Sequence, residues 1–378
     1  TVTGNVINQT KEGDVGISGS NITGNVTNKS KGEVVISNNS KIDGTVSNTG
    51  TSGDDEKGYV AILDSTVMGA INNAAENNIT IVNSTVNNVP TTNTEGKVAM
   101  IGAKTYDTLE KAIEAAQDGG TVVLLANITN ENVGTIDDDA DTVLTIDKSI
   151  TIQGNGNEIS IDLSIPDIFE DRDQIFSIGE TKESTVAVTL DGVTMNIKGN
   201  NTGKGDAFDV WGTLNITNGS NITVKNAQSA FTMQGGENAK VNIDKASTVT
   251  ANNIHGNFSN GGIWTIKEGS SLDINTAGNH GLSVEELTVD ASTVSVDGAA
   301  YTGILAATVT LKNDANVTVT NCGKDLPQKS QWAPDKESYK NAMELKGETP
   351  TLTVDNSTLT LTNNVNKDGT AINSIYLG

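Results

Sequence analysis

The one arginine of the chain, Arg172, is the first side chain to consider for acid–base chemistry. It lies in the run Ile165-Pro-Asp-Ile-Phe-Glu-Asp-Arg-Asp-Gln174. Neighbouring carboxylates stabilise a protonated guanidinium and raise its pKa, whereas a general base has to give up its proton. We therefore interpret this segment as a salt-bridged loop, and Arg172 as a candidate ligand contact. The acidic neighbours are Asp167, Glu170, Asp171 and Asp173.

Three aspartates at alternate positions, Asp137, Asp139 and Asp141, supply the oxygen ligands that calcium prefers. Their spacing differs from an EF-hand loop, because the central glycine and the terminal glutamate are missing. A solvated turn between strands is the favoured interpretation. A structural calcium ion is the alternative, and we expect no other cofactor.

Aromatic residues make up only 3% of the chain, so a loop that contains two of them stands out. The segment Cys322–Tyr339 holds Trp332 and Tyr339. A tryptophan on an exposed loop can stack on a sugar ring or anchor a protein contact. A tryptophan that folds back over the flank of the domain is the competing interpretation. Trp332 and Tyr339 are therefore candidate ligand-binding residues.

These candidates lie between the units of a sequence repeat. Each unit reads apolar-x-apolar, a short polar turn, and apolar-x-apolar again. Such short alternating strands at a fixed spacing are typical of a solenoid. The units begin at Val188, Leu214, Val241, Trp264, Leu287, Val309 and Leu352, and are separated by 26, 27, 23, 23, 22 and 43 residues.

A further strand precedes each unit, as in Ala207-Phe-Asp-Val210 and Gly303-Ile-Leu-Ala306. Period-two alternation in each strand sends one row of side chains inward and the next outward. Three strands per lap, without consistent hairpin turns, predict that each strand pairs in parallel with its counterpart in the next lap. The expected fold is an all-β, right-handed parallel β-helix.

The repeat also suggests how the chain divides. Residues 1–96 carry a shorter lap, expected to be the end of a preceding repeat region, and Pro90–Gly96 is predicted to be a break without strands. Residues 97–378 are predicted to form a capped β-helix with long loops near 163–175 and 322–340. Its cap is an amphipathic helix over about 107–118, with a capping box at Asp107-Thr-Leu-Glu110.

The composition of the chain argues against several classes of binding partner. A net charge of −23 argues against nucleic acid and against anionic membrane surfaces. No apolar run approaches the length of a membrane span, so no membrane insertion is expected. The single cysteine, Cys322, excludes an internal disulfide framework. Because the chain opens within a repeat, we expect it to be part of a longer surface polypeptide that carries the export signal and anchor.

The segments Lys104–Ala126 and Ile150–Asn155 resemble the opening of pectin-lyase-like β-helix domains of adhesin-like surface proteins from anaerobic gut bacteria. This resemblance implies an exported protein that is extracellular, at the bacterial cell surface or secreted. It does not imply catalysis, because the fold carries lyases, hydrolases, adhesins and inert stalks alike.

Glycoside hydrolases of this fold carry paired carboxylates on adjacent laps and a Gly-His-Gly segment, which Asn279-His280-Gly281 resembles locally. We find no such carboxylate pair in the preceding lap, His255–Gly262, and name no catalytic residue. The sequence favours a non-catalytic adhesin or structural stalk that binds glycan or host protein through loops. A polysaccharide lyase or glycoside hydrolase acting on acidic polysaccharide is the alternative.

Overall fold

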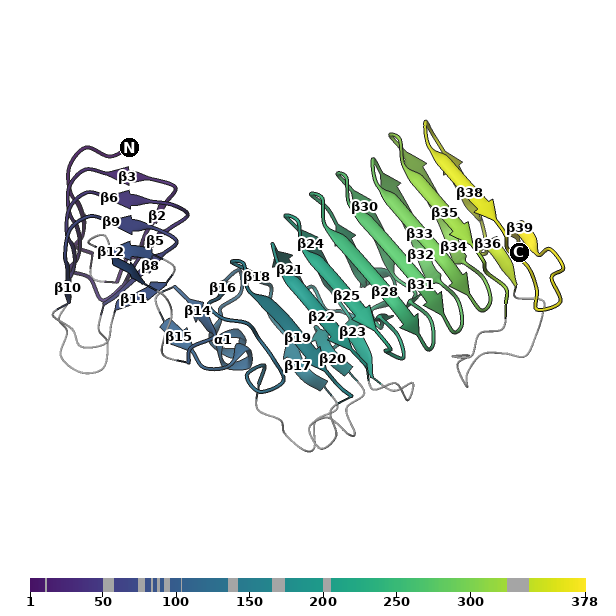
Figure 1. The fold of residues 1–378 in the computed structure, drawn as a ribbon, viewed down its shortest axis with the longest axis horizontal. Coiled ribbons are helices and arrows are strands. Elements are labelled where there is room, and N and C mark those ends of the chain that lie inside the picture. Colours follow the sequence, from purple (N-terminus) through teal and green to yellow (C-terminus); the bar gives the residue numbers. More distant parts are fainter. Residues whose placement is uncertain are drawn as a thin grey trace. The chain divides into compact units, whose positions relative to one another are not determined.

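The structure is a computed structural model, and it describes residues 1–10, 12–49, 58–73, 79–82, 84–86, 89–91, 96–102, 104–134, 142–164, 174–199, 205–324 and 340–378. The chain forms two compact units. The first comprises residues 1–115 and 121–126, and the second comprises residues 116–120 and 127–378. Both are built from short strands stacked in parallel (Figure 1).

The first unit stacks three sets of parallel strands, one from each side of its laps. Inward side chains such as Ile36 and Ile62 form its buried core. One inward corner carries asparagines in register, Asn8, Asn28 and Asn48, each of which donates to a backbone carbonyl. The sets are β1 (Val6–Asn8), β4 (Val26–Asn28), β7 (Val46–Asn48) and β10 (Ile71–Asn73); β2 (Val15–Ser18), β5 (Glu33–Ser37), β8 (Tyr59–Leu63) and β11 (Ile79–Val82); and β3 (Asn21–Ile22), β6 (Lys41–Ile42), β9 (Thr66–Val67) and β12 (Ser84–Val86).

The predicted break after residue 90 is wrong at its start, since β13 (Val89–Thr91) contains Pro90 and pairs antiparallel with β12. An edge strand tolerates proline because one side of its backbone needs no partner. An antiparallel group that the sequence did not predict follows. It comprises β14 (Ala99–Ile101), β15 (Lys104–Tyr106) and β16 (Thr121–Leu124).

The predicted helix is present as α1 (Leu109–Ala115), which buries Leu109, Ala112 and Ile113 and contacts β14 and β15. Its cap differs by one residue from the prediction, because Lys111 N donates to Thr108 Oγ1 (3.2 Å). Asp107 instead accepts from Lys111 Nζ (3.1 Å). Among the described residues no helix is both long and apolar enough to cross a membrane.

The second unit confirms the all-β parallel β-helix with three strands per lap. Its strands stack in three columns, and β32 (Leu282–Asp290) and β34 (Ile304–Lys312) each run through the first and second columns without a break. A short 3₁₀ turn, η1 (Gly236–Asn238), lies between β26 (Phe231–Met233) and β27 (Lys240–Ile243).

The first column contains β17 (Thr142–Ile146), β20 (Gln174–Ile178), β23 (Asp206–Val210), β26 (Phe231–Met233), β29 (Ser259–Asn260), β32, β34, β36 (Asn341–Leu345) and β39 (Asn373–Leu377). The second contains β18 (Ile150–Gln153), β21 (Ala187–Asp191), β24 (Thr213–Thr217), β27 (Lys240–Ile243), β30 (Ile263–Lys267), β32, β34 and β37 (Thr351–Val354). The third contains β19 (Glu158–Asp162), β22 (Thr194–Lys198), β25 (Asn221–Lys225), β28 (Thr248–Ile254), β31 (Ser271–Ala277), β33 (Thr293–Ala299), β35 (Asn316–Thr320) and β38 (Thr358–Thr362).

The sequence repeat corresponds to the register in which the strands pair. The inward residues that open successive units of the second column are direct partners on neighbouring strands and are fully buried. Each lap therefore sets its side chains directly above the equivalent side chains of the lap before. These residues are Leu214, Val241, Trp264, Leu287 and Val309.

Aromatic rings stack in the core of the first column. The ring centroids of Phe176 and Phe208 are 5.5 Å apart, and those of Phe208 and Phe231 are 4.9 Å apart with the rings nearly parallel. Trp264 meets Phe231 edge-on at 5.0 Å. Most of the aromatic rings among the described residues are therefore packed in the core.

The turns between the second and third columns are fixed by serine hydroxyls. Ser220 N donates to Ser247 Oγ, Ser247 N to Ser270 Oγ, and Ser270 N to Ser292 Oγ, each at 3.2 Å. Asn218 at the same kind of turn adopts a left-handed backbone with φ 55°. Asparagine tolerates this conformation better than most residues. The abundance of serine and asparagine therefore has a structural cause.

Replacing Phe208 tests the aromatic stack. Phe208→Ala should lower the free energy of unfolding by about 3–5 kcal/mol, because it leaves a cavity between two rings. Phe208→Leu fills most of that volume and should cost less. Chemical denaturation followed by circular dichroism measures both variants. Equal and small losses would show that the rings at this position are not packed as the structure has them.

Candidate binding face

The outer surface of the third column forms a flat, polar face, which we term the binding face. Strand alternation buries Ile159 and Ile161 of β19 and turns Glu158, Ser160 and Asp162 outward. The same alternation holds in the following laps, and the outward residues are register partners. They include Thr194, Asn196 and Lys198; Asn221, Thr223 and Lys225; Thr248, Thr250 and Asn252; and Asn316, Thr318 and Thr320.

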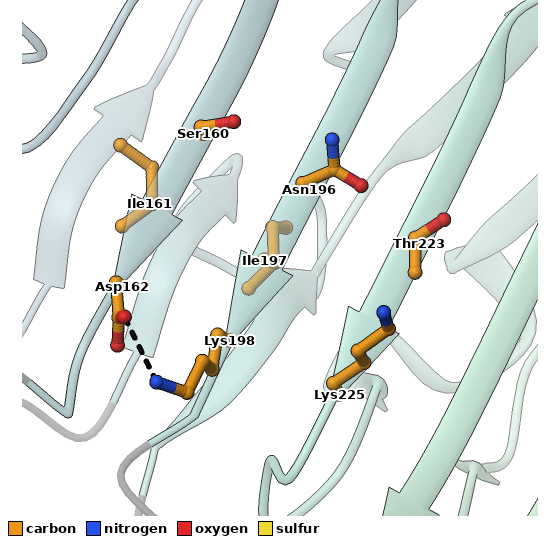
Figure 2. Close-up of a pocket in the computed structure, with 8 residues that line it drawn as sticks. All are labelled: Ser160, Ile161, Asp162, Asn196, Ile197, Lys198, Thr223 and Lys225. Carbon is orange, nitrogen blue, oxygen red and sulfur yellow. Dashed lines mark hydrogen bonds and ion pairs between the residues drawn. The ribbon is translucent and has the colours of Figure 1, made fainter.

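A depression of about 270 Å³ lies on this face across β19, β22 and β25. Ile161 and Ile197 are among the residues that line it, although strand alternation turns their side chains toward the core, where they are almost fully buried. Figure 2 shows the polar side chains around it in two rows, one with Ser160, Asn196 and Thr223 and one with Asp162, Lys198 and Lys225. Short polar residues in the first row leave space beside the longer lysines of the second.

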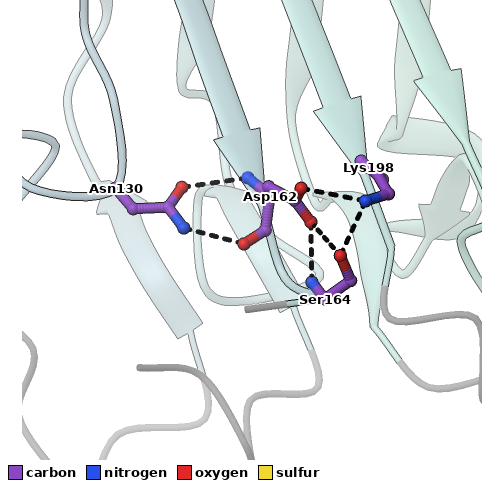
Figure 3. Close-up of polar contacts among 4 residues, drawn as sticks. All are labelled: Asn130, Asp162, Ser164 and Lys198. Atoms are coloured by element: carbon purple, nitrogen blue, oxygen red, sulfur yellow. Dashed lines mark hydrogen bonds and ion pairs between the residues drawn. The ribbon is translucent and has the colours of Figure 1, made fainter. Parts of the chain in front are cut away.

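Four residues fix one end of the depression (Figure 3). The amide of Asn130 donates to Asp162 O (2.7 Å) and accepts from Asp162 N (2.9 Å), so it holds the strand end on both sides. Lys198 Nζ donates to Asp162 Oδ2 (3.0 Å) and to Ser164 Oγ (2.7 Å). Ser164 in turn donates to Asp162 Oδ1 through its backbone N (2.8 Å) and its hydroxyl (2.5 Å).

These contacts keep Asp162 ionised. Partial burial raises the pKa of its carboxyl, but hydrogen bonds from Ser164 and Lys198 outweigh burial and bring the pKa below its ordinary value. At the opposite end of β19, the side chains of Ser160 and Asn196 donate to Glu158 and lower the pKa of that carboxyl. Both carboxylates therefore act as anchors for neighbouring polar groups.

A second site of chemical interest lies on the outer side of the first column. Asp209 is only 3% exposed, and its register partners are the hydroxyl residues Ser177 and Thr232. Trp211 Nε1 donates to Asp209 Oδ2 (3.1 Å), while Oδ1 is buried and has no hydrogen-bond partner among the described residues. Burial, together with the charge of Asp206, raises the pKa of Asp209 to about 6.

The histidine singled out by the sequence, His280, belongs to a polar corner of the β-helix. Its Nδ1 accepts from Thr302 N (3.3 Å), and its backbone N donates to Asn257 Oδ1 (3.1 Å). Loss of hydration lowers the pKa of its imidazole to about 4, so it is neutral at physiological pH. Cys322 is fully buried, and burial raises the pKa of its thiol to about 11. It is therefore no thiolate nucleophile.

All six candidate residues named from the sequence lie outside the described residues. They are Arg172, Trp332, Tyr339, Asp137, Asp139 and Asp141. Within the described part of the chain, no group of three or more His, Cys, Asp or Glu side chains is arranged to hold a metal ion. The calcium alternative at 137–141 stays a prediction.

The lysines of the binding face were missed, although the sequence carries a signal for them. Lys198 and Lys225 close the equivalent strands of successive laps, Thr194–Lys198 and Asn221–Lys225, and are separated by one repeat of 27 residues. A lysine at a strand end is usually a solvated residue. Only the register shows that the two side chains are neighbours.

Comparison of the chain with protein-family models, curated proteins and solved structures finds no match. The resemblance of Lys104–Ala126 to pectin-lyase-like domains therefore stays an expectation. Function has to be inferred from the residues of this chain.

The buried carboxyl of Asp209 should make stability depend on pH. A pKa raised from 3.8 to about 6 means that the folded state binds the proton more tightly, so stability falls as the pH rises through this window. Asp209→Asn should raise the free energy of unfolding at pH 7 by up to about 3 kcal/mol. It should have little effect at pH 4, where Asp209 is protonated.

Urea denaturation at both pH values measures this difference. Asp273→Asn is a matched control on the exposed side of β31, since burial also raises the pKa of Asp273 but the carboxyl is less enclosed. An equal change for Asp209→Asn at pH 4 and pH 7 would assign the effect to packing and contradict the electrostatic account.

Proposed function

We propose that the chain is a non-catalytic domain of an exported bacterial surface protein, an adhesin or structural stalk that binds glycan or host protein. One observation carries this proposal. The candidate residues lie in three segments, 135–141, 165–173 and 325–339. Each segment follows a strand or a bridged residue of the third column and precedes a strand of the first column. Because these flanking strands are stacked in register, the loops are attached along one edge of the β-helix.

The flanking elements make this arrangement concrete. Residues 165–173 follow β19 and precede β20, and residues 325–339 follow β35 and precede β36. Residues 135–141 precede β17 and follow Ile128, which bridges to Ile159 of the third column. Solenoids typically bind ligands through insertions on one side of a regular scaffold. This supports display of Arg172, Trp332 and Tyr339 to a ligand.

The binding face supports glycan as the ligand class. Its outward rows consist mainly of threonine, serine and asparagine, as in Thr248–Thr250 and Thr318–Thr320. Hydroxyls and amides donate and accept hydrogen bonds, which is what sugar hydroxyls require. The outward rows of β28 and β35 carry no charge that has to be desolvated when a neutral sugar binds.

One observation favours the enzyme alternative, namely the raised pKa of Asp209 on the outer side of the first column. A glycoside hydrolase needs a second carboxylate across the scissile bond. The register instead sets the hydroxyls of Ser177 and Thr232 on either side of Asp209. Asp206, the nearest acidic residue in sequence, already accepts from Ser229 N and Thr232 Oγ1. This setting supports a structural carboxyl more than a catalytic pair.

A glycan array and a pull-down with host secretions test the binding proposal. The intact chain should retain at least one class of glycan or one host protein. Trp332→Ala should weaken binding by about tenfold or more, because truncating an aromatic residue that anchors an interface typically costs about 2 kcal/mol or more. Retention of no glycan and no protein by the intact chain would overturn the proposal.

An assay for cleavage tests the alternative. The purified chain, incubated with pectin and with other acidic polysaccharides, should release neither unsaturated products nor reducing ends above the background of Asp209→Asn. Release that the wild-type chain shows and Asp209→Asn lacks would replace the binding proposal with a hydrolase or lyase.

A further inference from the structure

The charge of the residues in the second polar row of the depression changes from negative to positive within three laps. Asp162, Lys198 and Lys225 occupy equivalent positions on β19, β22 and β25. Neighbouring strands of a sheet lie about 4.8 Å apart, so the two lysine side chains leave the sheet side by side. Like charges directly opposite each other are unfavourable. The row holds one carboxylate and two ammonium groups, and Lys198 lies between Asp162 and Lys225.

The pairing leaves donors available at the depression. Lys198 Nζ uses two of its three protons on Asp162 and Ser164. Among the described residues, Lys225 and Thr223 have no hydrogen bond or ion pair through their side chains. The depression therefore presents an unbalanced positive charge and a free hydroxyl next to a polar row. This is a local exception in a chain with a net charge of −23.

We propose that this depression binds a sugar through an anionic substituent, a carboxylate or a sulfate, held between Lys198 and Lys225. The sugar ring lies over Ser160, Asn196 and Thr223, whose hydroxyls and amide meet the sugar hydroxyls. The inference deepens the proposed glycan-binding function and rests on it. It adds a site on the third column, away from the loops that the sequence singled out.

The size and surroundings of the depression define the ligand further. A volume of about 270 Å³ is below the range of about 300–1,000 Å³ for small-molecule sites, which suits one sugar unit. The acidic chain repels densely charged polymers such as nucleic acids, whereas a single anionic substituent meets the local lysines. The outward residues of β28 are the neutral Thr248, Thr250 and Asn252, so the rest of a glycan can continue over the next lap without meeting a charge there.

Three monosaccharides that differ in one group test the site. Glucose, glucuronic acid and glucose 6-sulfate are titrated into the intact chain and followed by saturation-transfer difference NMR. The two anionic sugars should bind, and glucose should bind about tenfold more weakly or not at all, because a hydrogen bond to a charged group is worth over 1 kcal/mol. The carboxylate and sulfate arms show which substituent the site prefers.

Two lysine variants give the matched comparison. Lys225→Ala should weaken binding of the anionic sugars by about tenfold, since it removes the unpaired ammonium and leaves the contacts of Asp162 and Lys198 in place. Lys240→Ala, at an exposed position of β27 in the second column, should leave binding unchanged. Thermal melting checks that both variants stay folded.

The outcomes separate the two proposals. Equal binding of glucose and the anionic sugars, or equal loss in Lys225→Ala and Lys240→Ala, overturns this inference. If the glycan array also retains a ligand, the proposed function stands without this site. If the array, the pull-down and the monosaccharides all show no binding, both proposals fail.

Discussion

Lateral pairing of equivalent parallel strands is the constraint on which the rest of the structure depends. A lap gains its backbone hydrogen bonds only if each strand meets its counterpart about 4.8 Å away in the same register. A shift by one residue would turn the inward row of side chains toward water. The buried partners Leu214, Val241 and Trp264 show the register held over successive laps. The serine hydroxyls at the turns hold the same spacing where no strand pairs.

This constraint explains what could be predicted from the sequence. Residues inside strands repeat in every lap. The period therefore predicted the number of strands in each lap and the row of inward residues to which Trp264 belongs. Features that occur once have no such repetition. For this reason the sequence misplaced the cap of α1, which is Thr108. It also missed the antiparallel pairing of β13 with β12 and of β14 with β15 and β16. Pro90, normally a strand breaker, is tolerated because β13 pairs on one side only.

The candidate functional residues also fall into two groups, those in insertions and those in repeated strands. Arg172, Trp332 and Tyr339 attracted notice because arginine and aromatic residues are rare in this chain. These three fall in insertions that the repeat does not position. Lys198 and Lys225 are ordinary residues at ordinary strand ends, and their significance depends on adjacency in the third dimension. A repeat alignment that compares outward positions lap by lap would have found them. Attention to the inward positions alone could not.

Stacking in register places equivalent side chains of successive laps next to one another. A charged residue in such a row therefore interacts with its neighbours differently from a neutral one. Columns of threonine, serine and asparagine stack without electrostatic cost because each is neutral. A charge in such a column has a neighbour at fixed short range, and burial weakens the screening of that interaction by solvent. Burial has its own cost for a charge, and Asp209 between Ser177 and Thr232 shows that cost as a raised pKa, to which the charge of Asp206 adds. Lys198 beside Lys225 shows the interaction between neighbours as positive charge that Asp162 only half balances. In a scaffold that can repeat neutral residues, a charge such as that of Lys225, without an ion-pair partner among the described residues, is where a ligand can supply one.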